Sequence, residues 1–241
     1  MPRYKPLHRY AEADTKKAPV LTPKQFDRLL YVARQTRNPE RNELIVWLLF
    51  AAGLRITEVA QRKINDVLFK SGAIRTEIIV PAKISKNGKA GHAFFYHPKL
   101  RSALDRYLSI RVERDIQRGK KDEFLGLRRD SVLILSELGS PYSLKIKRRV
   151  NSSGEEVNHL ACDTLQEVVS KWGREAGIVG FTTHSGRRTL ATRAARNGAS
   201  EEQLCALLRH TADDQPYGYI DADISGIRRV LEKLYAMPDA A

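Results

Sequence analysis

Cysteines, aromatic residues and long apolar runs are all scarce in this chain of 241 residues. Its only two cysteines, Cys162 and Cys205, fit neither a metal-ligand spacing nor a disulfide framework. Both fall in helix-like segments beside Leu and Ala, where a buried, reduced thiol is the simplest interpretation. The cysteines therefore favour a cytosolic compartment.

Apolar runs long enough to cross a bilayer are missing as well. The run 44–52 is too short for a span and is flanked by charge on both sides. The segment 1–17 is basic but lacks the apolar region of a signal peptide. We therefore expect a cytoplasmic, nucleoid-associated protein with no membrane partner.

Acidic residues are too few to balance the basic ones. Lys and Arg total 42 against 28 Asp and Glu, which gives a net charge of +14 and a pI of about 9.9. A surplus this large makes a polyanion the expected partner, because neutralising phosphates releases condensed counterions. Ribosomal and membrane-surface proteins share such a surplus, so charge favours nucleic acid without naming an activity.

The apolar periodicity predicts a mostly helical chain. A first helix should begin at the capping box Thr22-Pro23-Lys24-Gln25, with an apolar face that includes Phe26, Leu29, Leu30 and Val32. A second should be central to the core, because it is apolar nearly all round. The helices expected after the first cover 41–52, a segment from about 57, 100–116, 165–176, 185–197, 200–208 and 224–236.

Two segments predict antiparallel hairpins. The β-rich runs 74–81 and 92–96 flank Lys86-Asn87-Gly88-Lys89, and Asn-Gly between two such runs is a strong hairpin signal. A basic run, an Asn-Ser-Ser-Gly turn and an acidic return over 145–157 predict a second hairpin. Its role stays open between a solvated loop, a DNA contact and an inter-subunit element. We also expect a short strand at 131–136.

The expected fold class is thus mainly α with small antiparallel β-hairpins (α+β). No repeat or low-complexity linker divides the chain, so residues 21–241 form one expected domain. Residues 1–20 would be a basic N-terminal arm, which either lies along a phosphate backbone or is a solvated tail.

Cleavage of a phosphodiester by attack at phosphorus would explain several of the remaining residues. Such a reaction needs a nucleophile, neutralisation of the non-bridging oxygens and a proton for the leaving oxygen. Arginine suits the oxygens because its planar fork donates two parallel charge-assisted hydrogen bonds. The sequence shows no carboxylate cluster suited to a metal ion, so we expect no metal and no other cofactor.

Three segments can supply the cations and the nucleophile. In 51–58, Gly53 provides a turn and Arg55 sits between two helices. In 183–188, His184 and Arg187 share a face at a helix start, where the helix dipole favours phosphate. The third segment contains Leu208-Arg209-His210 and Tyr217-Gly218-Tyr219. Taken alone, Arg55 fits a surface salt bridge to Glu58, His184 a helix cap, and the tyrosines packing.

Together, the segments resemble the catalytic domain of the tyrosine recombinases, also called the phage integrase family, from about Leu21 to Tyr235. The order and spacing of four elements make this resemblance specific. The family's Gly-Leu-Arg-x-x-Glu element is matched by Gly53-Leu54-Arg55 with Glu58, and its His-x-x-Arg element by His184 with Arg187. Its Leu-Gly-His element is matched by Leu208-Arg209-His210, and the tyrosine nine residues after that histidine by Tyr219. The family also has a lysine on a hairpin turn, matched by Lys86, with Lys83 and Lys89 as alternatives.

The resemblance implies a role for each matched residue. Tyr219 would attack the scissile phosphate and form a 3′-phosphotyrosine, with Tyr217 in reserve. The ordinary pKa of tyrosine is about 10, so at neutral pH the residue is a poor nucleophile. Nearby cations would favour its phenolate and so activate it. The other implied roles are phosphate binding by Arg55 and Arg187, protonation of the 5′-hydroxyl by Lys86, assistance to proton transfer by His184, and a hydrogen bond to phosphate from His210.

The sequence departs from the family pattern in three places. Arg188 stands where many relatives have histidine and Arg209 where glycine is usual, and both keep positive charge near the phosphate. Most relatives also carry an N-terminal helical domain that closes a clamp on DNA, whereas here the catalytic motifs begin almost at once. We therefore expect lower intrinsic DNA affinity, which the arm or a partner protein would offset.

The function implied by the resemblance is site-specific recombination of integrase or invertase type. The enzyme would act on double-stranded DNA as a tetramer on two sites, with a partner recombinase or an accessory DNA-bending protein as further candidate partners. The predicted helix 224–236 would dock on a neighbouring subunit or on its own core, and both remain open.

Three other functions compete with this one. The first is an accessory DNA-binding protein that keeps the fold and recruits or activates a separate recombinase. A type IB topoisomerase would share the chemistry but relax supercoils without site preference. A simple basic binding module leaves the ordered Arg, His-x-x-Arg, His, Tyr series unexplained.

Overall fold

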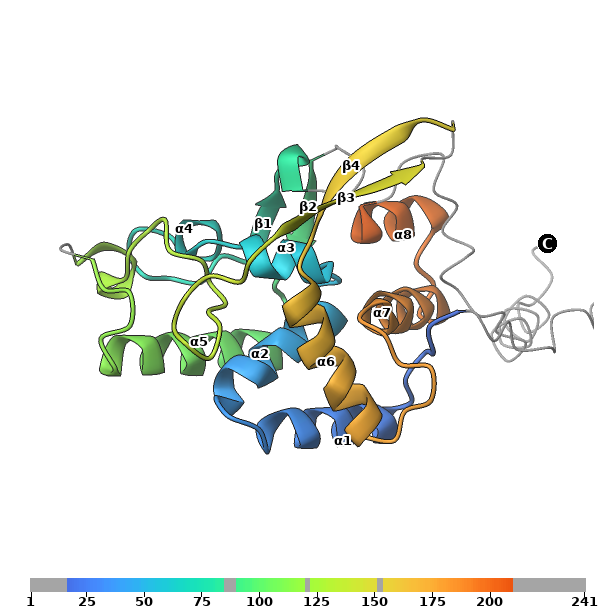
Figure 1. Cartoon of the computed structure of the whole chain (residues 1–241), viewed down its shortest axis with the longest axis horizontal. Coiled ribbons are helices and arrows are strands. Elements are labelled where there is room, and N and C mark those ends of the chain that lie inside the picture. The colour runs from blue at the N-terminus through green and yellow to red at the C-terminus, as the bar shows by residue number, and fades with distance from the viewer. Residues whose placement is uncertain (1–16, 85–89, 120–121, 151–153, 210–241) are drawn as a thin grey trace, which may run out of the picture.

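The computed structural model describes residues 17–84, 90–119, 122–150 and 154–209. Within these ranges most of the regular structure is helical, and two antiparallel hairpins complete it (Figure 1). The helices are α1 (Pro23–Arg34), α2 (Pro39–Phe50), α3 (Ile56–Gln61), α4 (Ile64–Val67), α5 (Pro98–Glu113), α6 (Asp163–Glu175), α7 (His184–Arg196), α8 (Glu201–Leu208) and the 3₁₀ turns η2 (Ala82–Ile84) and η3 (Glu123–Gly126). The strands are β1 (Glu77–Val80), β2 (Gly91–Phe94), β3 (Lys145–Val150) and β4 (Glu156–Ala161).

Helix α2 is the centre of the core, as its sequence predicts. Every residue from Arg41 to Phe50 is buried, and α1, α5 and α7 all pack against this helix. The apolar face of α1 uses Ala33, while Val32 is only half-buried. No helix of the described residues is long and apolar enough to span a bilayer.

Capping boxes fix where two helices begin. At α1, the Thr22 hydroxyl accepts from the Gln25 backbone N–H at 3.3 Å, and the Gln25 side chain accepts from the Thr22 N–H at 3.0 Å. Ser200 and Gln203 make the same reciprocal pair at the start of α8. Both predicted helix starts are therefore confirmed.

Both predicted hairpins are present. Strand β1 pairs with β2 in a register that places Val80 opposite Gly91, and β3 pairs with β4. The first connection is longer than a tight turn, because it begins with η2 and spans 81–90. The Asn87-Gly88 pair itself lies outside the described residues, as do the arm up to residue 16 and the predicted helix 224–236.

Two predicted elements are wrong in part. Segment 131–136 is not a strand, since it makes only an isolated bridge between Val132 and Lys63. The buried Arg111 guanidinium donates to its carbonyls instead, at 2.8 Å to Val132 O and 3.1 Å to Leu133 O. Helix α5 ends at Glu113 rather than near 116, because the backbone turns to positive φ at Asp115.

Both cysteines are free thiols, in agreement with the sequence. Cys162 is buried, and burial raises the pKa of its thiol above the usual value. Cys205 is half-buried on α8.

Helices α7 and α2 approach each other most closely at Gly186. A Cβ atom at this position would lie 2.7 Å from the carbonyl oxygen of Leu49, so only glycine fits without a shift of backbone. The contact presses the start of α7 against the end of α2. It thereby brings Arg187 next to the turn that carries Gly53 and Arg55.

Gly186→Ala tests this contact through the direction in which it changes the free energy of unfolding. Within a helix this substitution ordinarily stabilises a protein by about 1 kcal/mol. Here we expect a loss of about 1–3 kcal/mol, because the new methyl group overpacks against the α2 backbone. Urea unfolding measures the difference, and unchanged or increased stability would contradict the close approach.

Candidate active site

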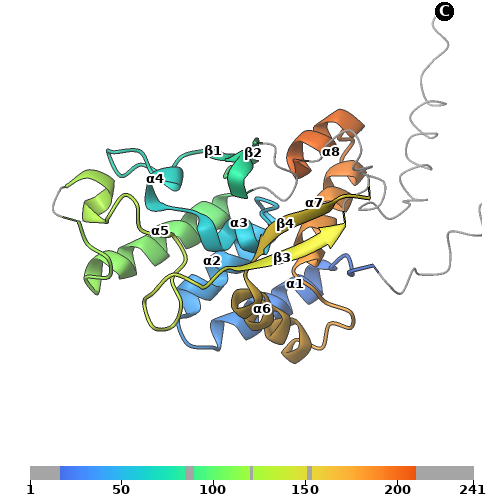
Figure 2. The same ribbon diagram turned by 45° about the horizontal axis from the view of Figure 1, so that its top comes forward.

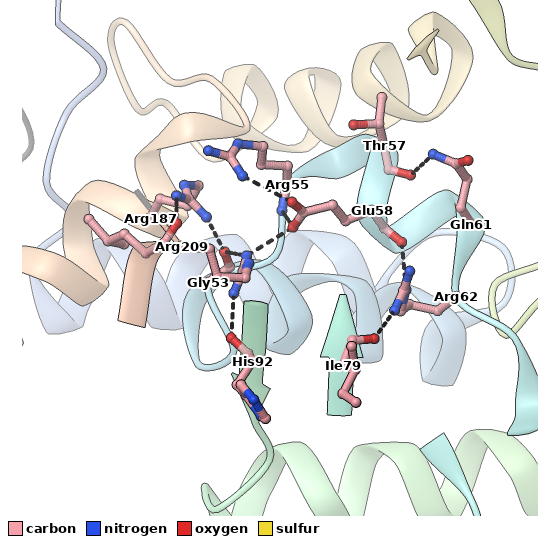
Figure 3. A network of polar contacts seen from close by, with 11 residues as sticks. Gly53, Arg55, Thr57, Glu58, Gln61, Arg62, Ile79, His92, Arg187 and Arg209 are labelled. Carbon is pink, nitrogen blue, oxygen red and sulfur yellow. Dashed lines mark hydrogen bonds and ion pairs between the residues drawn. The ribbon is translucent and has the colours of Figure 1, made fainter. Parts of the chain in front are cut away.

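The turn between α2 and α3 places Arg55 beside Glu58. Gly53 adopts φ +59°, a left-handed conformation that favours glycine, and Arg55 follows as the N-cap of α3. The Glu58 carboxylate accepts from the Arg55 backbone N–H at 2.8 Å and from Arg55 Nη1 at 3.0 Å (Figure 3). Taken alone, Arg55 fitted a surface salt bridge to Glu58; the pair exists, but the Glu58 side chain is fully buried.

Arg209 provides a second guanidinium for the same carboxylate. Its Nη2 lies 2.9 Å from Glu58 Oε2 and 2.8 Å from the Gly53 carbonyl oxygen, and its Nη1 donates to the His92 carbonyl at 3.3 Å. Arg209 caps α8 with φ +53°, a left-handed conformation that favours glycine. A left-handed non-glycine residue costs about 1–2 kcal/mol, and these hydrogen bonds offset that cost.

Arg187 joins the network from α7. It is 1% exposed, and its Nη1 donates to the Gly53 carbonyl oxygen at 2.6 Å. Its Nη2 donates to the carbonyl of Leu208 at the end of α8. The Gly53 carbonyl thus accepts from Arg187 and Arg209 together, so three separate segments meet at one backbone oxygen (Figure 3).

The charges of this cluster do not cancel. Burial raises the pKa of Glu58, but the attraction of Arg209, Arg55 and Arg187 outweighs it and holds that pKa below its usual value. Burial lowers the pKa of Arg209, although guanidinium groups stay protonated in proteins. Three arginines around one carboxylate leave an excess of positive charge, which is the electrostatic requirement for binding an anion.

A cavity of about 380 Å³ opens beside the cluster. Arg55, His184 and Arg187 border it, and so does Lys83 of η2. His184 is the exposed first residue of α7, and its backbone N–H donates to Thr182 Oγ1 at 3.2 Å. The structure therefore brings together three predicted site residues and one of the alternative lysines.

The remaining predicted residues cannot be placed. Lys86, Lys89, His210, Tyr217 and Tyr219 lie outside the described residues.

Arg188, the other departure from the family pattern, has a different role from the one its charge suggested. Its guanidinium donates to the Ala18 carbonyl and ties α7 to the segment before α1. It is buried there and is not among the residues that border the cavity.

Sequence reasoning missed one wall of the cavity. Ile146 of β3 and Asn158, His159 and Leu160 of β4 border it together with the arginines. A basic run with a turn predicts a hairpin, but no local signal shows which part of the body that hairpin will cover.

Comparisons with known proteins find similarity in sequence and in fold. The model of the phage integrase family matches residues 19–223. The tyrosine recombinase XerA of Pyrococcus horikoshii is 26% identical over 193 residues, which cover 80% of this chain and 54% of that protein. The chain thus spans about half the length of that curated relative.

Two solved structures show the same fold. A crystal structure of XerA recombinase aligns with a TM-score of 0.62 and 22% identity, covering 92% of this chain and 67% of the other. The Tn1549 transposon integrase in complex with transposon right end DNA aligns with a TM-score of 0.58 and 19% identity, covering 96% and 71%. The predicted fold class, mainly helical with small antiparallel hairpins, is confirmed.

Glu58→Gln keeps the shape of the central side chain and removes its charge. At neutral pH we expect a loss of about 3–5 kcal/mol in the free energy of unfolding, because three guanidinium groups remain around a neutral amide. The folded-state pKa of Glu58 lies below the unfolded one. Its contribution is therefore complete above the unfolded pKa and is lost as pH falls through the folded pKa.

The stability gap between wild type and Glu58→Gln should consequently shrink on acidification, as measured by urea unfolding across pH. Glu43→Gln is the comparison variant, because Glu43 is a buried carboxylate between Arg34 and Arg106, which lie away from the cavity and are each 46% exposed. Its pKa is also lowered, so its gap should shrink with acid as well, but the gap at neutral pH should be smaller because its partners are partly solvated. If the difference in unfolding free energy between wild type and Glu58→Gln stays constant down to acid pH, then Glu58 is not an ionised, arginine-bound carboxylate.

Proposed function

This chain belongs to the phage integrase family, and on that premise we propose that it cuts and rejoins double-stranded DNA at specific sites through a 3′-phosphotyrosine intermediate. The observation that carries the proposal is the meeting of Arg55 and Arg187 at one cavity, backed by the buried Glu58. The cavity has the charge that a scissile phosphate requires. Its cations come from separate segments, as a recombinase site demands.

The arginines would act on the phosphate oxygens. Glu58 accepts a hydrogen bond from the Arg55 guanidinium and so fixes its orientation. The backbone carbonyls of Gly53 and Leu208 fix the Arg187 guanidinium in the same way. Donors held in this way need little rearrangement as negative charge develops in the transition state. Loss of one such donor typically slows a reaction by about 10²–10³-fold.

Tyr219 is the proposed nucleophile. Its Oη attacks phosphorus, the bond from phosphorus to the 5′-oxygen breaks, and Lys86, or else Lys83 or Lys89, gives a proton to that oxygen. His184 assists proton transfer, and His210 donates a hydrogen bond to the phosphate. A 5′-hydroxyl of a partner strand then attacks the phosphotyrosine and releases Tyr219, so the number of phosphoester bonds is conserved and no ATP is needed.

The proposed assembly is four subunits on two DNA sites, with residues 21–241 as the catalytic unit and 1–20 as a DNA-contacting arm. The net charge of +14 supports a DNA partner. So does the likeness of fold to the Tn1549 transposon integrase, which was solved in complex with DNA.

Tyr219→Phe tests the nucleophile. The protein is incubated with supercoiled and nicked DNA from its native locus, and a protein–DNA adduct is sought by denaturing electrophoresis. Wild type and the control Tyr217→Phe should form the adduct, whereas Tyr219→Phe should form none because it lacks the attacking oxygen. Adduct formation by Tyr219→Phe would move the assignment to Tyr217, and DNA binding without any adduct would favour an accessory DNA-binding protein.

A sulfur leaving group tests the general acid. Replacing the bridging 5′-oxygen by sulfur removes the need for a proton, because a thiolate leaves without one. Lys86→Ala should slow adduct formation by about 10²–10⁴-fold on the normal strand, the range typical of a general acid, and recover on the sulfur strand. Lys83→Ala is the matched control, and recovery with that variant instead would assign the acid to Lys83.

A further inference from the structure

The β3–β4 hairpin borders the cavity that the proposed function assigns to the scissile phosphate. Ile146, Asn158 and Leu160 border the cavity together with Arg55 and His184. In both views the hairpin leaves the start of α6 and runs past α3 toward the side of α7 and α8 (Figures 1 and 2). A duplex that puts a phosphate between the arginines must therefore pass alongside the hairpin.

The strand register divides the hairpin into two faces. Ile146, Arg148 and Val150 share one face with their cross-strand partners, which are Leu160, Asn158 and Glu156. Lys147 belongs to the other face, opposite His159. Within that second face the Lys147 side chain is directed to α6, because its Nζ lies 2.6 Å from Asp163 Oδ1 at the start of that helix.

The first face is exposed and chemically mixed. Ile146 is 72% exposed and Val150 63%, with the exposed Arg148 between them. Asn158, directly opposite Arg148, is exposed too. Apolar side chains on a surface often mark a protein partner, but here they alternate with polar groups of the kinds that bind base edges.

Charge and shape both favour DNA as the occupant. Strand β3 has the sequence Lys-Ile-Lys-Arg-Arg-Val and no acidic residue. The acid of this face is Glu156, at the far end beside the turn. Two strands lie about 4.8 Å apart, and the major groove, roughly 12 Å wide, admits a two-stranded ribbon.

We propose that the β3–β4 hairpin lies in the major groove beside the cleaved phosphate and that Arg148 and Asn158 read base edges there. Arginine binds guanine O6 and N7 in a bidentate manner, and asparagine binds adenine N6 and N7 in the same way. Ile146 and Val150 are placed to contact thymine methyl groups. The inference rests on the proposed function, because it takes the arginine cavity as the phosphate site.

Selection from randomised duplexes tests the proposal. The full chain selects bound DNA from duplexes randomised on both sides of the cleavage site, and the recovered base preferences are compared between variants. Arg148→Ala should lose its preference for guanine at one position by about 10-fold or more, the discrimination that one bidentate contact supplies. Asn158→Ala should lose an adenine preference at the same or an adjacent position, since cross-strand partners lie close together.

Lys147→Ala is the matched control. It removes the same charge from the neighbouring position of β3 but from the other face, where the side chain is directed to α6, so it should leave the base preferences unchanged. Unchanged preferences in Arg148→Ala, or affinity reduced equally for every sequence with a smaller salt dependence, would overturn base reading. A change of assembly state by sedimentation with the preferences intact would overturn it as well, since the hairpin would then be an inter-subunit element.

Failure of this inference is distinguishable from failure of the proposed function. The selection depends only on binding, so Tyr219→Phe should return the wild-type preferences. If the adduct forms but Arg148→Ala leaves the base preferences unchanged, base reading by the hairpin is rejected and the proposed function stands. Preferences that depend on Arg148 without any adduct would support the hairpin and reject strand cleavage.

Discussion

The buried carboxylate of Glu58 is the interaction on which the arrangement of the site depends. It accepts from Arg55 and Arg209, while the neighbouring Gly53 carbonyl accepts from Arg187 and Arg209. Guanidinium groups this close together repel one another, and a single buried negative charge lowers that repulsion without cancelling the surplus. The result is a rigid cluster that remains attractive to a phosphate.

Backbone geometry prepares the cluster before any ligand arrives. The left-handed turn at Gly53 presents a carbonyl to two arginines, and the close approach at Gly186 holds Arg187 against it. Arg209 has a left-handed backbone conformation at the end of α8, and from there its side chain reaches Glu58. Each donor is therefore fixed by the fold, which is the condition under which electrostatic stabilisation of a transition state is most effective.

Local sequence signals anticipated much of the fold but not the long-range contacts of the site. The capping box at Thr22, the apolar α2 and the β-rich runs of the first hairpin depend on neighbours a few positions away, so the sequence alone predicts them. The hydrogen bond from Arg209 to Glu58 joins residues 151 positions apart. Its only trace in the sequence is an arginine at a position where the family pattern has glycine. The strand expected at 131–136 failed for a similar reason, because Arg111 takes the carbonyls that a neighbouring strand would have used. Lys86, His210 and Tyr219 stay predictions from the family pattern.

We propose that the arginine cluster neutralises the charge of a scissile phosphate. A methylphosphonate at the cleavage site, which replaces one charged oxygen by a neutral methyl group, tests it directly in DNA from the native locus. The rate of adduct formation is measured for wild type and Arg187→Ala on the phosphate and on the methylphosphonate. If Arg187 acts on the phosphate charge, Arg187→Ala reacts much more slowly than wild type on the phosphate, and this deficit shrinks on the neutral substrate. An equal deficit on both substrates would contradict it, because Arg187 would then support the fold without acting on the phosphate charge.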